Sequence, residues 1–275
     1  MTAQQPAMNL GRIDINKPNA ARMYDHYLGG VNNFEPDRLL AGQVEQVAPW
    51  VRHVARINRA WLRRVVLYLM DQGIRQFLDL GSGIPTVGNV HEIARRVDPA
   101  TRVVYVDYEP VAVHHGRELL AEDENTAVVE ADVRDTRSVL ENPDVNRLVD
   151  FDRPVGLLIA GLMLFIGDEH GPADMIRTYR EACPPGSLLA ISTMSQDEAD
   201  PRTAEQLAGL LRLYEAADEQ VHPRDRATIE SWFAGTELVE PGVVLLDAWR
   251  PENSASTSPA RLLGYGGVGR VPGRA

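Results

Sequence analysis

Phe77-Leu78-Asp79-Leu80-Gly81-Ser82-Gly83-Ile84-Pro85-Thr86 is the stretch that decides the fold, because an apolar strand pattern leads into an acid and two glycines. A helical pattern follows directly. Glycine tolerates backbone angles that other residues avoid, and it lets the main chain approach a ligand closely. The N-terminus of the following helix offers unpaired N–H groups to such a ligand. The stretch therefore predicts a nucleotide-type site at the end of a strand.

A second strand pattern supports this prediction. Val103-Val104-Tyr105-Val106-Asp107 ends in an acid 24 residues after Gly83, and a βαβ unit places its ribose-binding carboxylate at about that distance. Thr86 replaces the third glycine of the dinucleotide fingerprint. Asp79 puts a negative charge where a pyrophosphate would lie, although it suits a ligand with an ammonium and a sulfonium. A dinucleotide is therefore disfavoured.

These residues resemble the class I S-adenosylmethionine-dependent methyltransferases. The segment 79–83 looks like their first motif, and Asp107 looks like their ribose acid. Val128-Val129-Glu130-Ala131-Asp132-Val133 looks like their third motif, where an acid and an apolar residue bind adenine. The resemblance implies S-adenosylmethionine as cofactor and S-adenosylhomocysteine as product.

The resemblance also implies a set of cofactor-binding residues. Asp79 and the backbone of Gly81, Ser82 and Gly83 would hold the methionine part. Asp107 would bind the ribose, and Asp132 with Val133 the adenine. Further candidates are Tyr108 beside the adenine, Gly161 at the methionine end and Tyr24 in a lid.

The remaining patterns predict a Rossmann-like α/β fold of three layers. Residues 154–160 form an almost unbroken apolar run, as expected of a central parallel strand. A helix over 172–182 and a strand over 187–192 follow. Residues 237–240 and 243–249, joined by Pro241-Gly242, predict a hairpin. We therefore expect a mostly parallel, seven-stranded sheet that ends in an antiparallel hairpin, with its core over residues 71–250.

Residues 1–70 predict a helical cap. Asn16-Lys17-Pro18-Asn19 is an Asn/Pro start signal for a first helix, and Gly29-Gly30 is its stop signal. Amphipathic helices follow over about 36–47 and 51–70. Arg22-Met23-Tyr24-Asp25-His26-Tyr27-Leu28-Gly29-Gly30 resembles the opening of a bacterial S-adenosyl methyltransferase family of undetermined substrate. We expect this segment to close over the cofactor by rotating about Gly29-Gly30. Residues 251–275, which are rich in glycine and proline, are expected to form a mobile tail.

Composition restricts the partners and the compartment. The net charge of −11 argues against binding nucleic acid, and no apolar stretch reaches the roughly 20 residues that span a bilayer. No secretion signal is evident, and a lone cysteine, Cys183, cannot form an internal disulfide. We expect a cytoplasmic protein that acts on a small-molecule or peptide-like acceptor. Lys17 is the only lysine among 28 basic residues, a bias typical of high-GC bacterial genomes.

No catalytic residue emerges from the sequence. Asp25, His26 and His170 are each possible general bases, and no spacing of His, Asp or Glu predicts a metal site. Two alternatives to a methyltransferase stay open. One is an NAD-dependent oxidoreductase, and the other is a protein that binds S-adenosylmethionine without catalysis.

Overall fold

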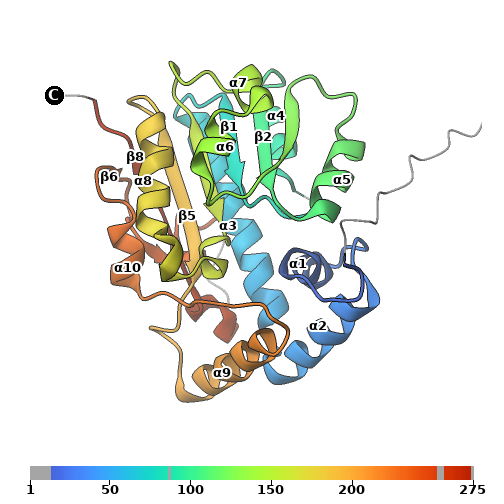
Figure 1. Cartoon of the computed structure of the whole chain (residues 1–275). Helices are drawn as coiled ribbons and strands as arrows, with labels where there is room; N and C mark the ends of the chain where they lie inside the picture. Colours follow the sequence, from blue (N-terminus) through green and yellow to red (C-terminus); the bar gives the residue numbers. More distant parts are fainter. Residues whose placement is uncertain (1–13, 86–87, 253–256, 274–275) are drawn as a thin grey trace, which may run out of the picture.

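One mixed sheet forms the centre of the molecule (Figure 1). The computed structural model describes residues 14–85, 88–252 and 257–273. The strand order is β3-β2-β1-β4-β5-β8-β6, with β7 paired to β8. The strands are β1 (Gln76–Leu80), β2 (Arg102–Asp107), β3 (Thr126–Glu130), β4 (Gly156–Ala160), β5 (Leu188–Met194), β6 (Glu237–Leu238), β7 (Val244–Leu245) and β8 (Gly264–Arg270).

The five central strands are parallel, and they are largely apolar on both faces because helices cover both faces of the sheet. Leu78 of β1 lies between Val104 of β2 and Leu157 of β4, and all three side chains are buried. The chain moves outward from β1 through β2 to β3 and then returns to the other side of β1 with β4. Ligands of open α/β sheets bind outside the carboxyl ends of the strands at such a reversal. The strand order therefore points to the ends of β1, β2 and β4.

Helices cover both faces of the sheet, so the predicted three layers are confirmed. The core on one face includes side chains from α6 (Thr136–Leu140), α7 (Pro143–Leu148), α8 (Pro172–Ala182) and α10 (Arg226–Ser231). The core on the other face includes side chains from α3 (Val51–Asp71), α4 (Val90–Arg95) and α5 (Pro110–Leu119). Short 3-10 helices lie at η2 (Met163–Phe165), η3 (Asp168–His170), η4 (Leu246–Ala248) and η5 (Pro259–Leu262).

The first two helices of the segment predicted as the cap, α1 (Ala20–Leu28) and α2 (Glu35–Val47), share a third core cluster with α9 (Pro201–Glu215), which was not predicted. In Figure 1 they lie together at the end of the molecule below the sheet. The predicted boundaries of α1 hold. Asn19 Oδ1 accepts hydrogen bonds from the N–H groups of Ala21 and Arg22, and Gly29 ends the helix at φ +86°. Trp61 of α3 belongs to the sheet core, so this helix connects the cap to the sheet.

The predicted terminal hairpin is wrong in its pairing. β6 and β7 both pair antiparallel with β8 and not with each other. Val239 N–H also donates to Val268 O at 2.8 Å, so residues 237–245 run along β8 as one interrupted edge. Pro241-Gly242 forms a turn in that edge, as predicted, and Gly242 N–H donates to Val239 O at 2.8 Å. The reason is that β8 supplies the hydrogen-bond partners that a hairpin would have supplied.

The prediction of a mobile tail over 251–275 is wrong for Gly264–Arg270, which form the buried strand β8 beside β5. The glycines are required by packing rather than by flexibility. A Cβ on Gly266 would lie 2.8 Å from Trp61 Cε2, so a side chain there would collide with the ring. On the other face of β8, a Cβ on Gly269 would lie 2.9 Å from Phe233 Cδ1, so β8 is glycine-rich because side chains pack directly against its backbone from both faces.

Candidate functional site

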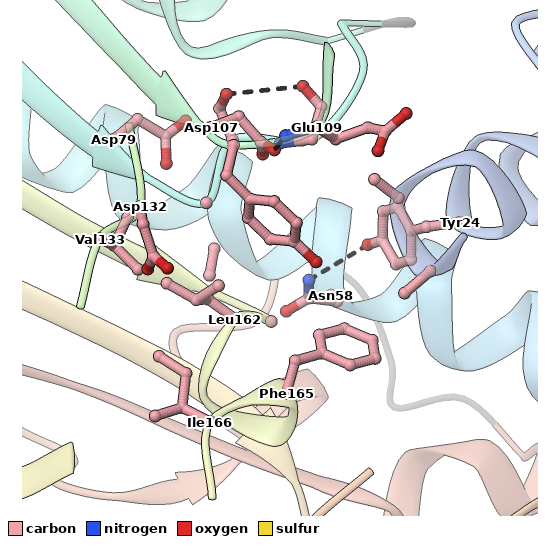
Figure 2. Close-up of a pocket in the computed structure, with 18 of the residues that line it drawn as sticks. Tyr24, Asn58, Asp79, Asp107, Glu109, Asp132, Val133, Leu162, Phe165 and Ile166 are labelled. Carbon is pink, nitrogen blue, oxygen red and sulfur yellow. Dashed lines mark hydrogen bonds between the residues drawn. The ribbon is translucent and has the colours of Figure 1, made fainter. Parts of the chain in front are cut away.

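A pocket opens at the carboxyl ends of β1, β2 and β4, between the sheet and α1 (Figure 2). Its empty space, including the open mouth, is about 1100 Å³. All ten residues predicted to bind the cofactor line it: Tyr24, Asp79, Gly81, Ser82, Gly83, Asp107, Tyr108, Asp132, Val133 and Gly161. The structure thus brings the predicted set together, while the role of each residue remains a prediction.

The loop after β1 is shaped by its two glycines. Gly81 and Gly83 have φ values of +70° and +66°, in the left-handed region that other residues rarely adopt. A Cβ on Gly81 would lie 2.6 Å from Leu162 Cδ1, and Gly81 N–H donates to Val106 O at 2.8 Å. The loop is therefore held against β2 and the segment after β4. Thr86 lies outside the described residues.

Asp107 is fixed by the backbone at the end of β2. One carboxylate oxygen accepts from Gly83 N–H at 2.7 Å, and the other accepts from Glu109 N–H at 2.9 Å. The side chain is 6% exposed. Burial raises its pKa, and these two N–H groups oppose the rise. Each oxygen keeps a further lone pair, so the carboxylate can accept hydrogen bonds from a diol.

Asp79 lies beside Asp107 without a hydrogen-bond donor of its own. It is 4% exposed, and no group in the described part of the chain hydrogen-bonds to its carboxylate. Burial raises the pKa of Asp79 to about 7, Arg59 lowers it, and Asp107 raises it further. A buried carboxylate with no donor is costly. A cationic ligand group would remove much of that cost.

Asp132 and Tyr108 line the pocket from the ends of β3 and β2. Arg134 pairs with Asp132 at 2.6 Å and holds the pKa of that carboxyl below its usual range. Val133 is buried beside it, whereas Tyr108 is 55% exposed. A large exposed ring on a pocket wall can cover a flat ligand such as a base. Sequence reasoning missed Arg134, although it follows the third motif by a single residue.

The wall formed by α1 depends on a hydrogen-bond chain that the sequence did not reveal. Ser192 Oγ donates to Asn58 Oδ1 at 2.6 Å, and Asn58 Nδ2 donates to the Tyr24 hydroxyl at 3.1 Å. Tyr24 in turn donates to the carbonyl of Ala55 at 3.2 Å. Burial raises the pKa of Tyr24, so the phenol stays neutral. The chain joins β5, α3 and α1 across the pocket.

A buried ion-pair cluster attaches α1 to the end of β2. Arg22 pairs with Asp37 of α2 and with Glu109, each at 2.9 Å. All three side chains are less than 10% exposed. Glu109 also lines the pocket. The segment 22–27 was singled out in the sequence, but the partners of Arg22 lie 15 and 87 residues away and carried no local signal.

None of the three possible bases lines the pocket. Asp25 Oδ2 accepts from Asn32 N–H and from Asn33 Nδ2, both at 2.9 Å, and so holds the turn after α1. His26 Nε2 lies 2.9 Å from Arg52 Nη2, and His170 Nε2 lies 3.0 Å from Arg134 Nη1. The catalytic residue thus stays unassigned.

Other features have structural explanations or are absent. Cys183 is buried, and burial raises the pKa of its thiol to about 12. Over residues 14–85, 88–252 and 257–273, no group of three or more His, Cys, Asp or Glu residues is placed to hold a metal. No helix in the same part of the chain is long and apolar enough to cross a bilayer.

Comparisons with known proteins identify the family. Residues 6–272 match the family model described as S-adenosyl methyltransferase. A candidate methyltransferase from Thermobifida fusca is 40% identical over 97% of this chain and 100% of its own, with a TM-score of 0.89. A DUF574 family protein from Streptomyces avermitilis is 36% identical over 95% and 100%, with a TM-score of 0.90. An O-methyltransferase family protein from Burkholderia thailandensis, 15% identical over 94% and 65% with a TM-score of 0.51, shares the fold alone. No curated protein matches the chain.

Proposed function

The chain belongs to the S-adenosyl methyltransferase family, and we propose that it methylates an oxygen or nitrogen nucleophile on a small-molecule or peptide-like acceptor. The acceptor is proposed to be neither nucleic acid nor membrane, in keeping with the net charge of −11. The site of action is proposed to be the cytoplasm of a bacterium.

The observation that carries the proposal is the pair of buried carboxylates at the ends of β1 and β2. Asp79 has no hydrogen-bond donor in the described part of the chain, and Asp107 is oriented by two backbone N–H groups. The methionine part of S-adenosylmethionine carries an ammonium and a carboxylate, which match Asp79 and the neighbouring Arg59. The ribose diol matches Asp107. The residues present therefore fit this cofactor on the chemistry of their side chains.

The contribution of the protein is to position the reactants and exclude water. Asp79, Asp107 and Asp132 would hold the three parts of the cofactor, with Val133 and Tyr108 covering the adenine. When bound, S-adenosylmethionine supplies a methyl carbon that bonds to the nucleophile as the C–S electron pair stays on sulfur and any proton lost passes to water. Gly161 and Tyr24 border the space in which that nucleophile would lie.

Calorimetric titration with S-adenosylhomocysteine and, separately, with NADH tests this function. We expect saturable binding of S-adenosylhomocysteine and none of NADH. The reverse result would indicate an oxidoreductase.

A non-catalytic binding protein is the second candidate, favoured by the fact that Asp25, His26 and His170 all lie outside the pocket lining. A crystal structure with bound S-adenosylhomocysteine separates the two. An open passage to the sulfur favours a transferase, and a sealed pocket favours a sensor.

A further inference from the structure

The side of the pocket that faces α1 differs from the side that the aspartates line. We call this side the acceptor subsite and define it by Ala20, Ala21, Tyr24, Asn58 and Phe165. In Figure 2 Tyr24 lies to the right of Asn58 and Phe165 below it, whereas Asp79 and Asp132 lie to its left. Except for the Asn58 amide and the Tyr24 hydroxyl, the side chains of the acceptor subsite are apolar.

The charged groups around the acceptor subsite are engaged elsewhere. Glu109 is paired with Arg22 at 2.9 Å, and Asp132 is paired with Arg134 at 2.6 Å. Arg59 donates to the carbonyl of Gly88 at 2.8 Å and lowers the pKa of Asp79 by its charge. An ionised acceptor would lose its hydration here. Because the surrounding charged groups already interact with other groups, no new ion pair would offset that loss.

Asn58 supplies one neutral donor whose orientation is fixed. Because Ser192 donates to its Oδ1, the amide nitrogen must face Tyr24, to which it gives one hydrogen. The second hydrogen of Nδ2 has no partner among the described residues. A Cβ on Gly161 would lie 3.0 Å from Nδ2, so the amide rests on the bare Cα of Gly161, where the segment after β4 begins. The Tyr24 hydroxyl has already given its proton to Ala55.

We propose that the acceptor subsite takes a neutral, flat, apolar ring whose hydroxyl oxygen accepts the second hydrogen of Asn58. The inference rests on the proposed function and specifies its substrate class. The rings of Tyr24 and Phe165 supply apolar and aromatic contact area. The oxygen then lies beside Gly161, next to the methionine end of the pocket, and reacts by the transfer given above.

Titrations with three probes that share a naphthalene ring and differ in charge test the proposal. The whole chain is saturated with S-adenosylhomocysteine and titrated at pH 7 with 2-naphthol, 2-naphthoate and 2-naphthylmethylamine, with binding followed by calorimetry and saturation-transfer NMR. We expect 2-naphthol to bind at least tenfold more tightly than either charged probe. Phe165→Ala should weaken 2-naphthol at least fivefold and leave the affinity for S-adenosylhomocysteine unchanged.

The matched control is Phe151→Ala, which removes the same side chain from a position packed against the sheet core. It should change neither affinity. If Phe165→Ala fails to fold, Ala21→Phe takes its place, since it fills the acceptor subsite from α1 and should also weaken 2-naphthol.

Tighter binding of a charged probe would overturn the proposal, as would absence of saturable 2-naphthol binding to a protein that holds S-adenosylhomocysteine. Failure to bind S-adenosylhomocysteine at all would instead refute the proposed function.

Discussion

Replacing Asp79 by asparagine should stabilise the ligand-free protein above about pH 7, and this gain should shrink as the pH falls. Burial raises the pKa of Asp79 from 3.8 to about 7. Between pH 3.8 and about pH 7, Asp79 in the folded protein keeps a proton that it has lost in the unfolded chain. The free energy of unfolding therefore falls as the pH rises. The destabilisation is absent below about pH 3.8 and complete above about pH 7. The amide that replaces the carboxyl group in the variant has no such proton to lose.

The size of the effect follows from the shift. A difference of 7 − 3.8 = 3.2 units, at about 1.36 kcal/mol each, corresponds to about 4 kcal/mol above pH 7. The buried amide costs about 1–3 kcal/mol of this if it lacks partners. That cost is the same at every pH. Between pH 5.5 and pH 8.5 the difference between variant and wild type should therefore grow by about 1.5 units, or about 2 kcal/mol.

Urea unfolding of the ligand-free proteins at pH 5.5 and pH 8.5 measures this growth, provided that the m-values agree. Asp71→Asn, at an exposed aspartate that ends α3, is the matched control. Its stability difference from the wild type should be the same at both pH values. An equal stability difference at both pH values for Asp79→Asn would refute the burial argument.

The same variant should bind S-adenosylhomocysteine more weakly, by about 1.5–3 kcal/mol, because the ligand ammonium loses its charged partner. In the wild type the affinity should likewise fall as the pH drops below about 7, where Asp79 becomes protonated. A variant that is more stable and binds less tightly is what a ligand-binding carboxylate predicts.

Three other predictions concern the ribose, the adenine and the cap. Asp107→Ala should weaken S-adenosylmethionine binding by about 1.5–3 kcal/mol, and an unchanged dissociation constant in a folded variant would remove Asp107 from the site. Asp132→Ala should abolish discrimination against the inosine analogue, which lacks the exocyclic amine, so persistent discrimination would contradict the adenine assignment. Amide exchange over residues 22–27 should slow when S-adenosylhomocysteine is added, and identical exchange with and without ligand would mark the segment as ordinary packing.

The sequence was sufficient for the parts of the site that lie at strand ends. Asp79, Asp107 and Asp132 each follow an apolar run, and parallel strands bring their carboxyl ends to one edge of the sheet. Their meeting in one pocket therefore follows from the strand order alone. The predicted core strands, the helices over residues 1–70 and the glycine loop were also found in the structure, because each has a local sequence pattern.

What the sequence could not predict depends on contacts between distant segments. Asn58 and Ser192 are 134 residues apart, and neither has a local pattern that names the other. β8 was missed because glycine has low strand propensity and leaves only Tyr265 and Val268 as strand formers. Its glycines are explained only by residues that pack against them from elsewhere in the chain, such as Trp61 at Gly266 and Phe233 at Gly267 and Gly269. The helix α9 was not predicted, although Asp200-Pro201 is a helix-start signal.

The buried cluster of Arg22 changes the expected motion of the cap. Rotation of α1 alone about Gly29-Gly30 would separate Arg22 from both Asp37 and Glu109, and breaking a buried ion pair typically costs about 3–5 kcal/mol. If α1 and α2 move together, the bond to Asp37 is kept and only the bond to Glu109 breaks. The turn after α1 is also held by the hydrogen bonds of Asp25, which resist bending at Gly30. If the cap closes on the cofactor, we therefore expect α1 and α2 to move together. Because Glu109 N–H also orients Asp107, closure of that pair and binding of the ribose are expected to stabilise each other.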